Sequence, residues 1–187
     1  YGERFSTRYK EVALRKIGIT QSRSEGDDRL LEGLGKCLRL VETDMTLFYR
    51  RLANIRLDHV EVDELTDTQV LEPLRDAWYQ PEAISPEHQK TLAEWLRVYM
   101  NRVGEENSDD AERKALMNRT NPKYVMRNYL AQLAIEKQEA GDASVLHELM
   151  EVMQNPYDEQ PQFEHYAEKM PDWARNKAGC SMLSCSS

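Results

Sequence analysis

The stretch that decides the fold class is residues 85–104, SPEHQKTLAEWLRVYMNRVG. Ser85 offers a capping hydroxyl directly before Pro86, which suits the first position of a helix because it has no N–H to leave unsatisfied. Gly104 supplies a stop at the other end. Between them the apolar residues recur every three or four positions, as on one face of a helix. They are Leu92, Trp95, Leu96, Tyr99 and Val103. The stretch therefore predicts an amphipathic helix with one face in a core.

The preceding segment shows the same helical signals. With Asp27 or Asp28 as the N-cap, the apolar residues of positions 30–41 fall on a single stripe. Cys37 lies inside that stripe, so we interpret it as a packing residue and not as a reactive thiol.

Helix starts recur along the rest of the chain. Asp44 precedes a run in which Met45 and Phe48 are expected to face inward, Pro73 starts a short helix, and Ser144 is expected to cap another. No run of alternating apolar and polar residues indicates a strand. The sequence predicts an all-α fold, an irregular bundle of about seven helices without a sheet. The expected core includes Leu34, Cys37, Phe48, Trp95, Tyr99, Tyr129 and Leu133.

A further helix is expected from the cap-and-proline pair Asn121-Pro122 to Gly141. On a helical wheel Arg127 falls in the middle of the widest apolar arc of this helix. A buried guanidinium must pair with a carboxylate or with several carbonyls, because an unpaired buried charge is very costly. An internal ion pair is the favoured interpretation, and contact with a partner surface is the alternative.

The last part of the chain has a different composition. Helical periodicity fades after Pro156. We expect a helical region of residues 1–170, followed by a flexible tail of residues 171–187 that holds Cys180 and Cys185. Because the cysteine count is odd and the spacing fits no disulfide framework, we expect a reducing compartment, the cytoplasm.

Charge and hydropathy exclude several classes of protein. The 187 residues carry a net charge of −8, with 33 acidic against 25 basic residues. The acids are spread along the chain, so we expect no nucleic acid partner and no anionic membrane surface as partner. No apolar stretch approaches the roughly 20 residues that span a bilayer. Because the chain opens on Tyr1 and not on Met, we expect it to be part of a longer one.

Motifs that carry chemistry are not recognisable in this sequence. It has no Gly-rich phosphate loop, no Gly-x-Ser-x-Gly elbow, no zinc-protease helix and no Cys-x-x-Cys pair. His147 and Glu151 share a helix face, but a metal site needs more ligands. The acid pair Asp109-Asp110 stands where a helix cap is expected. We therefore expect no catalytic residue, no cofactor-binding residue and no metal site in this chain.

Several segments together resemble the selenoprotein O family. The principal one is residues 121–129, NPKYVMRNY. The others are residues 44–48 (DMTLF), 72–77 (EPLRDA), 155–159 (NPYDE) and 170–173 (MPDW). They stand in order over most of the chain. Cys185, third from the end, occupies the place where the family has selenocysteine or cysteine.

The resemblance implies a pseudokinase-fold protein adenylyltransferase, which binds ATP with Mg²⁺ or Mn²⁺ and transfers AMP to Ser, Thr or Tyr hydroxyls of proteins. The catalytic and metal-binding motifs of the family belong to its N-terminal part, and none has a counterpart here. The chain is thus expected to be the C-terminal helical region, which packs behind that kinase-like part. By the same resemblance, Asn121, Pro122, Arg127 and Asn128 are structural motif positions.

The resemblance also suggests a regulatory role for Cys185. A thiol near the end of a Ser-rich tail is accessible and mobile. We expect Cys185 to form a reversible disulfide with a cysteine of the N-terminal part and so to tune activity with redox state. Cys180 is the second possible partner.

Three functions stay open at this point. The first is a supporting and regulatory segment of a protein adenylyltransferase, and the second is a free-standing helical interaction module without catalysis. The third, a thiol redox protein, ranks last because the spacing of Cys180 and Cys185 is not a known redox motif. Exposed apolar surface distinguishes the first two, since a segment separated from its partner part should present an apolar patch of several hundred Å².

Overall fold

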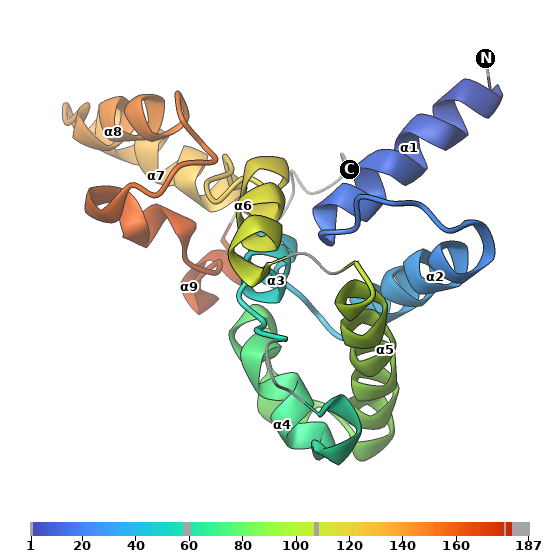
Figure 1. Ribbon diagram of the computed structural model, residues 1–187. Helices are drawn as coiled ribbons and strands as arrows, with labels where there is room; N and C mark the ends of the chain where they lie inside the picture. The colour runs from blue at the N-terminus through green and yellow to red at the C-terminus, as the bar shows by residue number, and fades with distance from the viewer. Residues whose placement is uncertain (1, 58–60, 107–108, 178, 181–187) are drawn as a thin grey trace. The chain divides into compact units, whose positions relative to one another are not determined.

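The structure, a computed structural model, describes residues 2–57, 61–106, 109–177 and 179–180. Over these residues it consists of helices and loops, without a strand (Figure 1). Thr43 and Trp78 form an isolated antiparallel β-bridge. Seven α-helices of the described residues have eight residues or more. The prediction of an all-α fold with about seven helices is confirmed.

The chain divides into two compact units, residues 1–121 and residues 122–187, each with its own apolar core. The helices of the first unit are α1 (Gly2–Lys16), α2 (Ser24–Leu40), α3 (Met45–Leu52), η1 (Val62–Glu64), α4 (Asp67–Leu71), η2 (Glu72–Ala77), η3 (Pro81–Ala83), α5 (Pro86–Gly104) and α6 (Asp110–Thr120). Those of the second unit are α7 (Asn128–Glu139), α8 (Ser144–Val152), η4 (Pro161–Ala167) and α9 (Asp172–Arg175). The boundary lies inside the range 1–170 that the sequence analysis treats as one helical region, because the apolar faces on either side of it close on separate cores.

Helix α5 has the bounds that its capping residues predict. The Ser85 hydroxyl accepts a hydrogen bond from the His88 N–H at 3.2 Å, and Pro86 is the first helical residue. All five residues of the predicted apolar face are buried. The tenth residue of the helix, Trp95, donates from its ring Nε1 to the Leu30 carbonyl of α2 at 3.0 Å.

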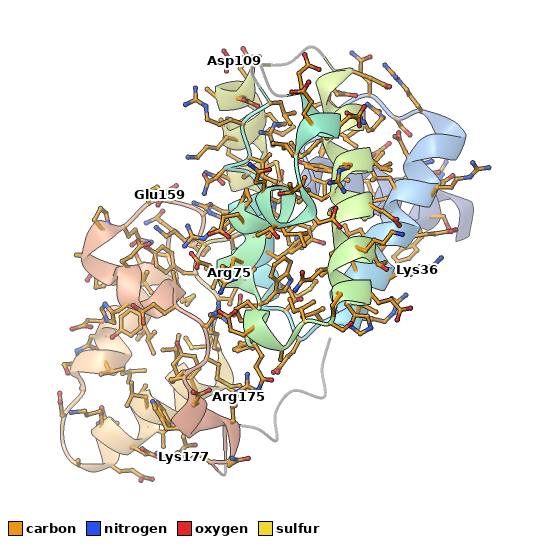
Figure 2. The ribbon with its side chains drawn as sticks, turned by 90° about the horizontal axis from the view of Figure 1, so that it is seen from below. Lys36, Arg75, Asp109, Glu159, Arg175 and Lys177 are labelled. Atoms are coloured by element: carbon orange, nitrogen blue, oxygen red, sulfur yellow. The ribbon has the colours of Figure 1, made fainter. Side chains whose placement is uncertain are left out.

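A glycine allows α2 and α5 to pack this closely. A Cβ at Gly33 would lie 2.7 Å from the Trp95 ring, a separation that real Cβ atoms do not adopt. The absence of a side chain at Gly33 therefore lets the indole lie against the backbone of α2. Figure 2 shows Lys36 on the outer side of α2, whereas its neighbour Cys37 is buried in the core.

The helix starts are partly as predicted. Asp44 caps α3 by accepting from the Leu47 N–H at 3.0 Å, and Asp109 caps α6. The prediction of Asp27 or Asp28 as the N-cap of α2 is wrong, because α2 begins at Ser24 and its N-cap is Arg23. The Asp27 carboxylate accepts from the backbone N–H of that N-cap residue. Residue 27 is thus part of the capping arrangement without being the cap.

The predicted core is confirmed for six of its seven residues, and Leu133 is partly exposed. The buried face of α7 is formed by Tyr129, Leu130 and Ala134, which leaves Leu133 at its border. Met45, expected to face inward, is 49% exposed at the start of α3. Ser144 is the first residue of α8, and the Asp142 carboxylate accepts from its N–H, so Ser144 does not cap that helix.

The predicted tail of residues 171–187 is packed in the part that the structure describes. Residues 172–175 form α9, and Ala174 is fully buried. Cys180 is only 3% exposed and belongs to the core of the second unit. Residues 181–187 lie outside the described residues.

No helix of the described residues is a candidate for crossing a membrane. None of them combines the length and the apolar character that a bilayer-crossing helix requires.

Arg113 of α6 is a buried charge that joins α6 to α5 and to the segment after α3. Its guanidinium donates to the Asp110 carboxylate at 3.0 Å, to the Tyr99 hydroxyl at 3.3 Å and to the carbonyl of Ile55. Burial raises the pKa of Tyr99 to about 12, although the neighbouring Arg113 acts in the opposite direction. The hydroxyl is therefore protonated at neutral pH.

A second buried guanidinium, that of Arg102, lies at the end of α5. It donates to Asp27 at 2.8 Å, to Glu106 at 2.9 Å and to the Gln21 carbonyl at 2.7 Å. The Asp27 side chain is fully buried and the Arg102 side chain is 10% exposed. Burial raises the pKa of Glu106, but hydrogen bonds from Thr20 and Arg102 outweigh it, so the pKa lies below its ordinary value. The Glu106 carboxylate is therefore a charged partner of Arg102 at neutral pH.

Replacing Arg102 by methionine should destabilise the chain strongly. The Arg102→Met variant leaves the buried carboxylate of Asp27 without its cation, which costs about 3–5 kcal/mol of unfolding free energy. The control is Arg8→Met, since Arg8 pairs with Glu11 on the surface, with side chains 73% and 50% exposed. That change should cost less than about 1 kcal/mol. Chemical denaturation of both variants measures the difference, and equal losses would contradict the burial of the Arg102 cluster.

Candidate functional site

The segment around Asn121 is the candidate site, because it holds the principal motif of the resemblance. The structure corrects its conformation. Residues 122–127 are not helical, α6 ends at Thr120 with Asn121 as its C-cap, and α7 begins only at Asn128. The prediction of one helix from Asn121 to Gly141 is therefore wrong in its first seven residues.

Two physical features end α6 at this point. Asn121 precedes a proline, and the proline ring disfavours the α conformation of the residue before it. Asn121 accordingly has φ −113° and ψ 114°. Its side-chain amide donates to the carbonyls of Met117 at 2.9 Å and Lys16 at 2.8 Å. The asparagine thus satisfies carbonyls at the ends of α6 and α1, and it is 2% exposed.

Beyond Pro122 the chain joins a second piece of the resemblance. The backbone N–H groups of Lys123 and Tyr124 both donate to the Pro156 carbonyl, at 2.8 and 3.0 Å. The Tyr124 hydroxyl donates to the Gln160 carbonyl at 2.9 Å. Two motifs that lie more than 30 residues apart in the sequence are thereby held together. We call this arrangement of Lys123, Tyr124, Pro156 and Gln160 the motif junction.

Charge reinforces the motif junction. The Lys123 ammonium lies 2.5 Å from a carboxylate oxygen of Glu159 and 2.5 Å from one of Glu164. Burial lowers the pKa of Lys123, but the two carboxylates outweigh it and hold the pKa above its ordinary value. Figure 2 shows Glu159 at the surface of the second unit, on the segment that follows α8. Both glutamates are largely exposed, so solvent screens these ion pairs, and their contribution to stability is small.

Sequence reasoning missed Gln160, whose side chain adds further hydrogen bonds at the motif junction. Its side-chain amide donates to the carbonyls of Val152 at 3.1 Å and Asn155 at 2.9 Å. It thus satisfies backbone groups at the end of α8 and in the turn after it. The only sequence signal was its place next to the segment of residues 155–159, because glutamine has no pattern that marks such a role.

Arg127 occupies a different position from the one that the helical wheel predicts. It is the N-cap residue of α7, with extended backbone and a partly exposed side chain. Its carbonyl accepts from the N–H groups of Leu130 and Ala131 at 3.0 and 3.1 Å. Since the preceding residues are not helical, the wheel does not apply to them, and its placement of Arg127 inside an apolar arc is wrong.

Of the three cysteines, two are buried and the third lies outside the described residues. Cys37 is 3% exposed, and burial raises the pKa of its thiol to about 11. This confirms the interpretation of Cys37 as a packing residue. Cys180 is equally buried, as a free thiol. Cys185 lies outside the described residues.

Potential metal ligands and a pocket of the first unit show what small ligands would meet among the described residues. Among them, no group of three or more His, Cys, Asp or Glu side chains could hold a metal. A pocket beside η2, lined among others by Arg75, Trp78 and Gln89, encloses about 60 Å³. Ligand sites for small molecules commonly enclose about 300–1,000 Å³. The pocket beside η2 is thus much smaller than a usual small-molecule site.

Comparison with known proteins gives a match over most of the chain. The family model described as "Protein adenylyltransferase SelO" matches residues 1–154. A "Protein nucleotidyltransferase YdiU" of Rhodopirellula baltica is 46% identical over 191 residues, which cover all of this chain and 35% of the relative. Its counterpart in Nitrosospira multiformis is 44% identical over 203 residues, covering all of this chain and 36% of that protein. The chain spans about a third of the length of the curated relatives it matches.

Removing the Tyr124 hydroxyl should weaken the motif junction. Tyr124 is 1% exposed, and its hydroxyl both donates to the Gln160 carbonyl and accepts from the Gln160 N–H. The Tyr124→Phe variant leaves these groups without their partner and should lose about 1–3 kcal/mol of unfolding free energy. Tyr9→Phe makes the same chemical change at a residue that is 67% exposed and should be nearly neutral. Hydrogen exchange of the Gln160 amide, faster in Tyr124→Phe only, locates the effect, and unchanged exchange would contradict the junction.

Proposed function

Because the chain belongs to the SelO family of protein adenylyltransferases, we propose that it is the C-terminal helical part of a protein nucleotidyltransferase. The observation that carries the proposal is the family match over residues 1–154 together with 46% identity across the whole chain. The parent enzyme transfers AMP from ATP to Ser, Thr or Tyr hydroxyls of protein substrates in the cytoplasm. ATP and Mg²⁺ or Mn²⁺ are bound by its N-terminal, kinase-like part.

This segment supports the catalytic part without touching the nucleotide. Phosphoryl-type transfer depends chiefly on positioning and charge neutralisation, so elements that hold the catalytic part in place affect the rate. One feature supports this role. Two segments of the resemblance, residues 121–129 and 155–159, meet in backbone hydrogen bonds, and the Tyr124 hydroxyl adds a further one just beyond them.

Asn121, Pro122, Arg127 and Asn128 act as structural residues in this proposal. The amide of Asn121 joins the ends of α1 and α6, and Pro122 prevents α6 from continuing. The carbonyl of Arg127 accepts the first hydrogen bonds of α7, and Asn128 opens that helix. Asn121 and Pro122 thus end α6, and Arg127 and Asn128 begin α7.

A free-standing helical interaction module is the alternative function. Relatives that match the chain over its whole length are about three times as long, which favours a part of a larger enzyme. The two functions differ in what the parent protein does with ATP.

The parent protein should carry out AMP transfer, and the 187-residue segment should not. Incubated with ATP labelled in its α-phosphate and with Mg²⁺ or Mn²⁺, the full-length protein should label proteins on hydroxyl side chains. The segment alone should show no micromolar binding of ATP·Mg²⁺ in calorimetric titration, since its described residues offer neither a phosphate cradle nor metal ligands. Absence of label with the full-length protein would sink the proposed enzyme, and micromolar binding by the segment would contradict the division of labour.

Redox control through Cys185 is the finer part of the proposal. Two thiols, that of Cys185 and that of a cysteine in the catalytic part, are oxidised to a disulfide by hydrogen peroxide. The two thiols lose two protons and two electrons, and the peroxide is reduced to two molecules of water. Cys180 is the less suitable partner, because it is buried in the core of the second unit and would have to leave it.

Mild oxidation of the full-length protein tests this control. Mass mapping without reductant should find Cys185 in a disulfide with a cysteine outside these 187 residues, and reductant should change the rate of AMP transfer. The Cys185→Ser variant should be indifferent to both treatments. A Cys185 that stays a free thiol, in an enzyme that does not respond to reductant, would defeat the proposal.

A further inference from the structure

Helix α1 carries an apolar face that the first unit does not cover. Phe5 is 66% exposed, Tyr9 67% and Val12 44%. Spacings of four and three residues place the three side chains on one face of the helix. The rings of Phe5 and Tyr9 stack with their centroids 6.4 Å apart. The three residues, here called the α1 face, form a continuous stripe along the helix.

Only the C-terminal end of α1 is anchored in the core. Leu14 and Ile17 are buried, whereas residues 4–9 are all exposed (α1 is blue in Figure 1). Leu14 lies about 180° around the helix from Phe5, so the anchored side and the α1 face point in opposite directions. Two aromatic rings and a valine that stay largely exposed, on a helix whose opposite side is anchored in the core, indicate a surface for a partner.

The net charge of α1 indicates the charge that a complementary partner surface should carry. The helix has five basic residues and two acidic ones, a net charge of 5 − 2 = +3, in a chain whose net charge is −8. Arg4, Arg8 and Arg15 are all exposed and fall on one flank of the α1 face, within about 40° of each other around the helix. Aromatic and arginine side chains are the residue types that dominate binding energy at interfaces. The complementary surface is therefore an apolar groove with an acidic rim along one side.

We propose that the α1 face docks into such a groove on the catalytic part of the same polypeptide. The proposal rests on the proposed function, because the chain spans only about a third of the length of its relatives and the occupant is sought in the remaining two thirds. A partner on the same polypeptide has a high effective concentration, so a small face with two aromatic anchors suffices to hold it. A second copy of α1 is a poor occupant, since two helices of charge +3 repel each other.

Photo-crosslinking in the full-length protein tests the α1 face. The photoreactive residue p-benzoylphenylalanine replaces Tyr9 in one variant (Tyr9→p-benzoylphenylalanine) and Thr7 in the matched control. Thr7 is exposed on the same turn but lies about 200° around the helix from Phe5. The Tyr9 variant should crosslink to residues of the same polypeptide outside these 187 residues, and the Thr7 variant should not.

Other crosslinking results overturn the proposal. Crosslinks from the Tyr9 variant to a second copy, crosslinks confined to these 187 residues, or none at all would show that the catalytic part does not cover the α1 face. Equal crosslinking from Thr7 would show that contact is not specific to this face. None of these results depends on enzyme activity, so a full-length protein that crosslinks as expected but transfers no AMP would overturn the proposed function alone.

Proteolysis gives a second measurement on the same protein. The double variant Phe5→Ser/Tyr9→Ser removes both aromatic anchors and should raise the rate of limited proteolysis in α1 by at least about tenfold, through loss of docking. The control Val98→Ser changes another exposed apolar residue of the first unit, 57% exposed on α5, and should change that rate by less than about twofold. Equal rates in the double variant and the parent would overturn the docking.

Discussion

The constraint on which the first unit depends is that two buried guanidinium groups must be neutralised. Arg102 and Arg113 could not be removed from water without charged and carbonyl partners, because an unpaired buried charge costs more than a typical domain can spare. Asp27 and Glu106 meet Arg102, and Asp110 meets Arg113. The pair with Asp27 joins the end of α5 to the start of α2, and the hydrogen bond from Arg113 to the Tyr99 hydroxyl joins α6 to α5. Apolar packing fills the space between them, but it does not by itself choose which helix ends meet.

In the second unit backbone hydrogen bonds have the corresponding role. An Asn-Pro pair ends a helix because the proline disfavours α conformation in the residue before it. Here it releases a short extended segment, whose N–H groups reach the Pro156 carbonyl. The carbonyl of Pro156, in the second Asn-Pro pair, thus accepts from the N–H groups of Lys123 and Tyr124, which follow the first pair. Near the buried Tyr124 such partners are needed, since buried polar backbone groups would otherwise be unsatisfied.

The polar groups in the interior and the exposed groups on the surface have different roles. The interior of the chain is occupied by structural hydrogen bonds and ion pairs, so the residues with unusual pKa values, such as Tyr99 and Glu106, serve packing. The surface carries the features that point to a partner. On α1 two aromatic side chains are largely exposed, and arginines line their flank.

The sequence by itself determined the all-α class, the bounds of α5, the cap at Asp44 and the inert character of Cys37, because each depends on neighbours within one or two helical turns. The family was also readable, since its motifs are local strings. Only the tertiary structure decided where Asn121 and Arg127 lie. Their conformation depends on the carbonyls of Lys16 and Pro156, which are far away in the sequence and carry no side-chain signature. The same holds for Cys180, whose polar and small neighbours suggested a tail, while its burial comes from packing against a core that no local pattern announces.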